Sequence, residues 1–181
     1  MPRREFEELC DALLDRIGFH TSEEPFAPDW PLFLHRQYTR DEILVAIGKA
    51  ELVGKRHTQV GRIWFEEMNA EILFVTLAKT ERSFSPTTRY EDFAVSPTQF
   101  HWQSQSTTRE DSPTGQRYVR QPENRVNFLL FVRPTTDDPF VFLGAVRYLN
   151  HTGSRPMSIY WELEKPMPAW FFETCASLRV A

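Results

Sequence analysis

The sequence predicts an α+β domain whose main part is an antiparallel β-barrel with flanking helices. Large flat side chains, fifteen Phe and five Trp, favour strands over a helical bundle. Seven Gly and thirteen Pro indicate many turns and few long helices. Three apolar runs with tight connections, residues 125–134, 140–149 and 158–164, are typical of a meander that closes or nearly closes on itself.

The first element expected along the chain is an amphipathic helix. Its apolar side chains recur at helical spacing and form one stripe, made of Phe6, Leu9, Cys10, Leu13, Leu14 and Ile17. Gly18 is placed to end this helix. The helix docks on the body of the protein or, alternatively, offers its apolar face to a partner. Residues 19–37 are rich in proline and are expected to form an extended connector.

The second helix has a clear beginning and end. Thr39 and Glu42 have the spacing of a capping box, and Gly48 follows as a stop. The apolar residues between them predict a single buried face, formed by Ile43, Leu44 and Ile47.

Strands dominate the remainder. Residues 60–67 and 71–79 flank a short turn and predict a β-hairpin. One helical turn is expected at residues 96–99, since Ser, Pro and Gln occupy N-cap, N1 and N3 positions. A short C-terminal helix is expected to start near Pro168. The predicted organisation is therefore an acidic helix and connector (1–30), a β-barrel domain (31–168) and a C-terminal helix or tail (169–181).

The net charge of −4 is unevenly distributed. Residues 1–30 carry three arginines against eight acids, which leaves about +1 for residues 31–181. A nearly neutral body disfavours broad electrostatic binding to nucleic acid, although it permits a local pocket around one base. Cys10 and Cys175 are the two cysteines and form no CxxC pair. With no signal-type or membrane-spanning apolar run, a cytoplasmic location is expected.

Motifs of common enzyme classes do not occur in the chain. There is no phosphate-binding glycine loop, no nucleophile elbow and no zinc-binding HExxH, and the five His are scattered. The sequence therefore predicts a binding domain with no cofactor or metal, rather than an enzyme. A metal-dependent nuclease using Glu91, Asp92, Glu110 or Asp111 is the disfavoured alternative, since no metal-ligand spacing occurs.

The stretch from Lys79 to Tyr118 differs from the rest of the chain. It mixes aromatic rings with hydroxyls, amides and arginines and has little aliphatic content. Aromatic faces beside amide and hydroxyl groups are suited to stacking a flat polar ring and reading its edge. This stretch is the sequence's strongest indication of function.

Several segments carry a family resemblance. In order, they are PLFLHRQYTRDEILVAIG, FVTLAKTERSFSPTTRYEDFAVSPTQFHWQSQSTTREDSPTGQRY, LLFVRP, FVFLGAVRY and GSRPMSIYWELEKPMP. They resemble a bacterial domain of unknown function that usually ends large superfamily 2 (DEAD/DEAH-type) helicases, often with a phospholipase D-like nuclease module. Some such proteins are restriction enzymes that cleave DNA carrying modified cytosine. Their C-terminal domain is similar to the SRA domain, a PUA-like β-barrel that flips a methylated cytosine into a pocket. The resemblance covers roughly residues 31–168.

The resemblance implies a DNA-binding reader of 5-methyl- or 5-hydroxymethylcytosine that works by base flipping. Such a reader would target a modification-dependent restriction or phage defence system. The expected base-binding residues are Tyr38, Tyr90, Asp92, His101, Trp102, Gln103, Ser104, Gln105 and Tyr118. The expected phosphate contacts are Lys79, Arg82, Ser85, Thr87, Thr88, Arg89, Arg109 and Arg117. The alternative is an interaction or regulatory module that docks on a helicase–nuclease partner in cis or in trans through the acidic N-terminal helix.

Alternation along residues 100–106 leaves two choices for the pocket. If this run is a strand, Phe100, Trp102, Ser104 and Ser106 share one face, and His101, Gln103 and Gln105 share the other. Only one face can line a pocket. Phe100 and Trp102 also suit an ordinary core, because a barrel needs large inward side chains.

Overall fold

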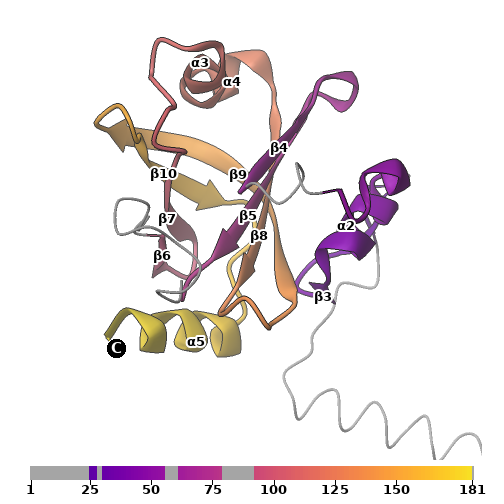
Figure 1. Ribbon diagram of the computed structural model, residues 1–181. Helices are drawn as coiled ribbons and strands as arrows, with labels where there is room; N and C mark the ends of the chain where they lie inside the picture. The colour runs from indigo at the N-terminus through magenta and orange to yellow at the C-terminus, as the bar shows by residue number, and fades with distance from the viewer. Residues whose placement is uncertain (1–24, 28–29, 56–60, 79–91, 181) are drawn as a thin grey trace, which may run out of the picture.

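The computed structural model describes residues 25–27, 30–55, 61–78 and 92–180. It is an α+β fold built on one large mixed sheet (Figure 1). The predicted helix at residues 6–17 lies outside the described residues. The strands are β1 (Pro25–Ala27), β2 (Trp30–Phe33), β3 (Gln37–Tyr38), β4 (Arg62–Phe65), β5 (Ala70–Thr76), β6 (Phe93–Ser96), β7 (Gln99–Gln103), β8 (Asn127–Arg133), β9 (Phe140–Thr152) and β10 (Ser158–Leu163). The α-helices are α2 (Arg40–Ala46), α3 (Pro113–Val119), α4 (Gln121–Asn124) and α5 (Ala169–Val180), with 3-10 turns η1 (Ala50–Leu52) and η3 (Glu66–Met68).

The large sheet runs in the order β4-β5-β8-β9-β10-β7-β6, and β3 pairs with the start of β9. The predicted meander is confirmed, because β8, β9 and β10 pair antiparallel in sequence order. The remaining neighbours come from distant parts of the chain. β5 pairs parallel with β8, and β7 pairs antiparallel with β10.

The sheet curls around an inner core. Its buried side chains come from β5 near one end of the sheet and from β6 and β7 at the other, so one concave face encloses them. Trp161 and Phe128 lie at the centre, with ring centroids 4.8 Å apart. Figure 1 shows α5 across one end of this sheet and α3 and α4 at the opposite end.

A bulge helps β9 to bend. The pairing of β8 with β9 shifts between Leu130 and Phe131, and Gly144 lies opposite Leu130. Gly144 has φ +87°, and a Cβ at this position would lie 2.8 Å from Leu34 Cδ1. Only glycine combines this backbone conformation with such close packing, and bulges increase the local twist of a strand.

The barrel expected from the sequence is not confirmed. The sheet path ends at β4 on one side and at β6 on the other, and no pairing joins these two strands within the described ranges. What the structure shows is a curled, open sheet of mixed direction.

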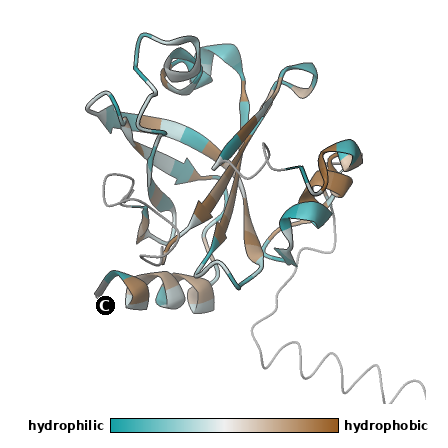
Figure 2. Cartoon of the chain, viewed as in Figure 1, coloured by the Kyte–Doolittle hydropathy of each residue, from teal (hydrophilic) through white to brown (hydrophobic). Residues whose placement is uncertain are grey.

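A second core lies on the outer face of β4, β5, β8 and the first half of β9. The helix α2 and the β1–β2 hairpin cover it, and Ile43, Leu44 and Leu32 are fully buried there. Figure 2 shows the most hydrophobic residues on β5, β8 and α2. This is expected, because β5 and β8 are covered on both faces and α2 packs on one of them.

Two local predictions are confirmed. Thr39 and Glu42 form the predicted capping box, with the Glu42 amide donating to Thr39 Oγ1 at 3.2 Å and the Thr39 amide donating to Glu42 Oε2 at 2.7 Å. β4 and β5 form the predicted hairpin, and Asn69 makes its turn in the left-handed conformation at φ +44°.

The helical turn predicted at residues 96–99 is wrong. These residues make the tight turn between antiparallel strands β6 and β7, and Ser96 Oγ accepts from the amide of Thr98 at 3.2 Å. A serine two residues before the donor closes a β-turn as readily as it caps a helix. Helices α3 and α4 were not predicted.

Candidate nucleic-acid interface

The segment between β5 and β6 is fixed to the sheet at both ends. Where it leaves β5, the amides of Leu77 and Ala78 donate to the carbonyls of Arg133 and Pro134 at 3.0 and 2.8 Å. Where it enters β6, Asp92 Oδ1 accepts from the amide of Gln103 at 2.9 Å. The predicted ligand contacts between these ends lie outside the described residues: Lys79, Arg82, Ser85, Thr87, Thr88, Arg89 and Tyr90.

The inner face of β7 belongs to the core. Phe100 and Trp102 are 0% and 4% exposed, and the Trp102 ring meets Tyr118 edge-on at 5.5 Å. Ser104 is also buried, and its Oγ accepts from the amide of Met157 at 2.9 Å. Trp102, Ser104 and Tyr118 therefore present no surface to a base in this structure, and the base contacts predicted for them are not supported.

The outer face of β7 carries a row of rings. His101 stacks on Phe93 with ring centroids 4.6 Å apart, and Tyr160 of β10 meets the other side of His101 edge-on at 4.9 Å. Arg179 of α5 ends the row, with Cζ 4.0 Å from the centre of the Phe93 ring. His101 is buried beneath these neighbours at 5% exposed, so a direct base contact is no better supported for it than for Trp102, whereas Phe93 and Tyr160 keep part of their surface exposed.

Amide and hydroxyl groups flank this row. Gln103 Nε2 donates to Ser158 Oγ at 3.2 Å, and its backbone amide holds Asp92 as described above. Gln105 follows the strand and is partly exposed. The fold thus places His101 and Gln103 on the outer face of β7, and it bonds Asp92, the residue before β6, to the backbone amide of Gln103.

Tyr38 lies elsewhere. It belongs to β3 on the second core, where its hydroxyl accepts from the amide of Phe33 at 2.7 Å. One side of its ring lines an apolar hollow of about 440 Å³ beside Val45 and Val53. A shared base pocket with His101 is therefore not supported for Tyr38.

Arg117 and Tyr118 meet at a buried carboxylate instead of a ligand. Glu71 of β5 is fully buried, and it accepts from Arg117 Nε at 3.2 Å, from Arg62 Nη1 at 3.0 Å and from Tyr118 Oη at 3.1 Å. Arg117 also lies over the ring of Trp64, 4.5 Å from its centre. Burial, followed by the charge of Glu71, raises the pKa of Tyr118 far above its usual range. The phosphate contact predicted for Arg117 is not supported, because its guanidinium is part of this cluster.

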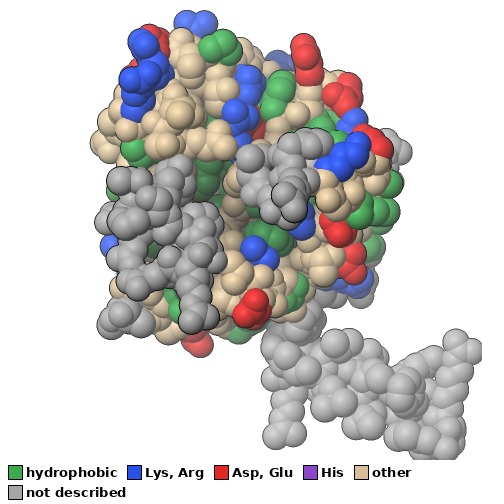
Figure 3. Space-filling model, viewed as in Figure 1, with side chains coloured by type: hydrophobic (Ala, Val, Ile, Leu, Met, Phe, Trp, Pro, Cys, Tyr) green, Lys and Arg blue, Asp and Glu red, His purple; other side chains and the backbone are tan. Residues whose placement is uncertain are grey.

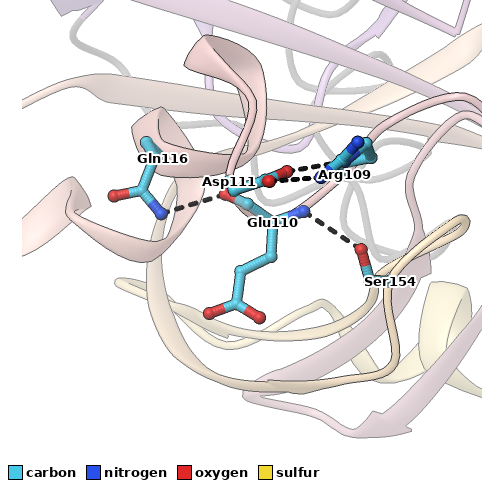
Figure 4. A pocket seen from close by; sticks show the side chains of 5 residues that line it. All are labelled: Arg109, Glu110, Asp111, Gln116 and Ser154. Atoms are coloured by element: carbon cyan, nitrogen blue, oxygen red, sulfur yellow. Dashed lines mark hydrogen bonds and ion pairs between the residues drawn. The ribbon is translucent and has the colours of Figure 1, made fainter.

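Arg109 lies on the far side of α3, in a polar hollow of about 340 Å³ (Figure 4). Its Nε donates to Asp111 Oδ1 at 2.7 Å, and this ion pair holds the pKa of Asp111 below its usual value. The neighbouring backbone is tied to other elements, since Gln116 Nε2 donates to the Glu110 carbonyl at 2.9 Å and the Glu110 amide donates to Ser154 Oγ at 3.2 Å. Arg109 remains half exposed, so it retains access to a phosphate.

A chain of polar groups links this hollow to β9. Tyr148 Oη lies 2.6 Å from His151 Nδ1, and His151 Nε2 lies 3.4 Å from Glu110 Oε2. Burial, followed by the charge of Glu110, raises the pKa of Tyr148, so its phenol keeps its proton at neutral pH. Glu110 and Asp111 are therefore engaged with His151 and Arg109.

Within the described part of the chain, no group of three or more His, Cys, Asp or Glu side chains could hold a metal ion. None of the described helices is long and apolar enough to cross a membrane. Figure 3 shows basic and acidic side chains interspersed with neutral ones on the face it displays, without a broad patch of one sign.

Sequence reasoning missed three residues of the outer row: Phe93, Tyr160 and Arg179. Phe93 and Tyr160 could have been found by alternation, since each is one position out of phase with buried neighbours on its strand. Arg179 had no such signal, because its place depends on how α5 docks against β6.

A family model described as a domain of unknown function (DUF3427) matches residues 32–175. The match begins in β2 and ends in α5, so it includes the buried residues of both cores. The search of curated proteins found no match to this chain.

Proposed function

We propose that this chain, which belongs to the family DUF3427, a domain of unknown function, over residues 32–175, reads a modified base in DNA. The base is a cytosine carrying a 5-methyl or 5-hydroxymethyl group, flipped out of the duplex. The observation that supports this reading best is the partly exposed ring of Tyr160 against His101 on the outer face, close to Gln103, whose backbone amide bonds Asp92.

The energetics of base flipping set what such a face must supply. Extruding a base costs a few kcal/mol in stacking and pairing, and stacking on an aromatic ring returns about 1–3 kcal/mol. Tyr160 is the candidate platform, because it is partly exposed and its ring is held by His101. A few hydrogen bonds to the base edge would then offset the rest.

Asp92 and Gln103 are the candidates for reading that edge. A carboxylate is the natural partner for the exocyclic amine of cytosine, and it offers about four acceptor positions. The bond from the Gln103 amide uses one of them and fixes the direction of the side chain. The Gln103 side chain, oriented by Ser158, supplies its amide nitrogen as a donor to the ring nitrogen or the carbonyl oxygen of cytosine, both of which are acceptors.

The proposal extends to the role of the whole domain. The curled sheet is an open relative of the SRA-like, PUA-like barrel, and the domain acts as a cytoplasmic targeting module without catalysis of its own. A helicase or nuclease, in the same chain or in a partner, supplies motor and cleavage in a restriction or phage defence system.

The test is a titration of three duplexes that differ only at one cytosine: unmodified, 5-methylated and 5-hydroxymethylated, at one salt concentration. Tighter binding to a modified duplex is expected. Equal affinity for all three would contradict the proposal.

Substitution of Asp92 tests whether this residue recognises the modified base. Asp92→Ala should abolish discrimination and leave weak, salt-sensitive binding, and thermal melting checks that the variant is folded. Glu173→Ala, which removes an exposed carboxylate of α5, is the matched control and should discriminate as the wild type does. Discrimination that survives in Asp92→Ala would remove Asp92 from the site.

The alternative is a module that docks on a helicase–nuclease partner through the acidic N-terminal segment. The structure determines where the deletion that tests this alternative must end. Phe26 of β1 packs edge-on against Phe142 at 5.4 Å, and β1 pairs with β2, so a cut at residue 30 would damage the fold. Deleting residues 1–24 should abolish association and leave nucleic-acid binding intact. Association that is unchanged by this deletion would exclude the alternative.

A further inference from the structure

Two arginines lie on one aromatic pair at the edge of the second core. Arg40 at the start of α2 lies over Phe74, with Cζ 3.9 Å from the ring centre. Arg133 at the end of β8 lies over Phe140 at 4.4 Å, and the two phenyl rings meet edge to face at 5.3 Å. The fold therefore holds two guanidinium groups close together on an apolar base.

The two cations affect each other. Burial, followed by the charge of Arg133, lowers the pKa of Arg40 to about 10, against a smaller opposing effect of the exposed Asp41. Burial also lowers the pKa of Arg133, against the opposing charges of Asp137 and Asp138. Partly buried like charges are costly unless an anion compensates them.

Arg133 has neutral partners only. Its Nε donates to Thr76 Oγ1 at 2.9 Å and its Nη1 to the Thr136 carbonyl at 2.8 Å. Among the described residues no carboxylate lies within ion-pair distance of it, and Asp138 is held by Thr135 at 2.7 Å. Arg40 has a further interaction of its own, so the inference rests on the charge of Arg133 and on the approach of a second cation.

The position of Arg133 relates this pair to the proposed interface. The carbonyls of Arg133 and Pro134 hold Leu77 and Ala78, the last described residues before the 79–91 segment. We propose that Arg133, beside the positive charge of Arg40, binds a phosphate group at this corner of the domain. The planar guanidinium group matches the geometry of two phosphate oxygens. The rings of Phe74 and Phe140 beneath the two guanidinium groups hold them in place. Resting on the proposed function, the phosphate is that of the DNA backbone beside the flipped base.

The first experiment needs no DNA. Thermal melting of the full chain is compared in inorganic phosphate and in chloride at matched ionic strength. The wild type should melt about 2–4 °C higher once phosphate exceeds its dissociation constant several-fold. Arg133→Gln should lose this difference, and Arg133→Lys, which keeps the charge without the fork, should lose most of it. Arg147→Gln, which removes an exposed guanidinium paired with Glu162, is the matched control and should keep the difference, which separates site binding from general stabilisation by phosphate.

The second experiment identifies the source of the phosphate. The logarithm of affinity for an unmodified duplex falls with the logarithm of salt, with a slope of about −0.9 per phosphate contact. Arg133→Gln should reduce this slope by about one contact, equally for modified and unmodified duplexes. If Arg133→Gln leaves the salt slope unchanged but still loses the stabilisation by inorganic phosphate, the site binds a small phosphate compound and not the DNA backbone. If phosphate raises the melting temperature of Arg133→Gln over that in chloride by as much as it does for the wild type, the proposal is overturned, whatever the outcome for base discrimination.

Discussion

Tyr118 donates its phenolic hydrogen to Glu71 at 3.1 Å, and the carboxylate that accepts it is fully buried near the start of β5. Arg62 and Arg117 bind the same carboxylate from β4 and α3, with about a fifth of each side chain exposed. One acid thus joins the two strands of the β4–β5 hairpin to a helix more than forty residues further along the chain.

Glu71→Gln should be strongly destabilising. The amide keeps the volume of the side chain, but it leaves two partly buried arginines without an anion. Breaking a buried ion pair from one side costs about 3–5 kcal/mol, and the exposure of the arginines favours the lower end, about 3 kcal/mol. Urea unfolding measures the change. Glu66→Gln, at an exposed position in the adjacent turn, is the control and should change stability by less than about 0.5 kcal/mol. Equal losses in the two variants would contradict the assigned role.

Alkaline pH should destabilise the domain through Cys175. Burial raises the pKa of this thiol from 9.0 to about 12. Above pH 9.0 the unfolded chain releases the proton while the folded chain keeps it, so the contribution is intact below pH 9.0 and is lost as pH rises toward 12. The slope is at most about 1.4 kcal/mol per pH unit.

Cys175→Ala isolates this effect. Urea unfolding between pH 9.0 and pH 10.0 should show a shallower loss of stability in the variant than in the wild type. Tyr118, whose pKa is raised in the same direction, adds its own loss only above pH 10.0. Parallel pH profiles for the two proteins would mean that the thiol is not protected by burial.

The elements that sequence reasoning predicted correctly carry their information within a few residues. The capping box of Thr39 and Glu42 fixes the start of α2 by hydrogen bonds three residues apart. The turn at Asn69 specifies the β4–β5 hairpin in the same local way. The parallel pairing of β5 with β8 has no such signal, because two buried strands far apart in the chain choose each other through packing.

The candidate site was predicted less well for a related reason. Alternation showed that β7 has two faces, but the inner one could be identified only once the curled sheet placed Trp102 against Tyr118 and Trp161. Tyr118 looks like a ligand contact in the sequence only as long as α3, the helix that buries its ring, is not identified. Ser112 caps that helix by accepting from the amide of Gly115 at 3.1 Å, and Pro113 follows it, so a local signal was present.

Gly115→Ala should destabilise the domain although alanine favours helices. A Cβ at this position would lie 2.1 Å from the Arg109 carbonyl oxygen and 2.7 Å from that of Glu110, and backbone atoms cannot turn aside. The clash should outweigh the usual helical gain of about 1 kcal/mol and leave a net loss of about 1–3 kcal/mol. Gly61→Ala is the control, since its nearest contact is an ordinary 3.5 Å. Thermal melting compares the two, and a stabilised Gly115→Ala would show that the 109–110 backbone can move away.

Thr39→Ala should weaken the start of α2. It removes the hydroxyl that accepts from the Glu42 amide, and loss of an N-cap costs about 0.5–2 kcal/mol. Thr136→Ala, at an exposed loop position whose contact with Arg133 uses only the backbone, should be nearly neutral. Urea midpoints measure both, and a neutral Thr39→Ala would mean that packing of Ile43 and Leu44 alone holds the helix.

Aromatic residues on the two faces of the sheet should respond in opposite ways. Trp102→Ala removes an inner ring and should cost about 3–5 kcal/mol of stability, because it opens a cavity beside Tyr118. Tyr160→Ala removes an outer, partly exposed ring, so it should cost less stability but weaken binding of a modified duplex by about tenfold or more, equivalent to about 1–3 kcal/mol of stacking. Melting and duplex titration on the same samples separate the two effects. Full duplex affinity in a folded Tyr160→Ala variant would show that the base does not stack on this ring.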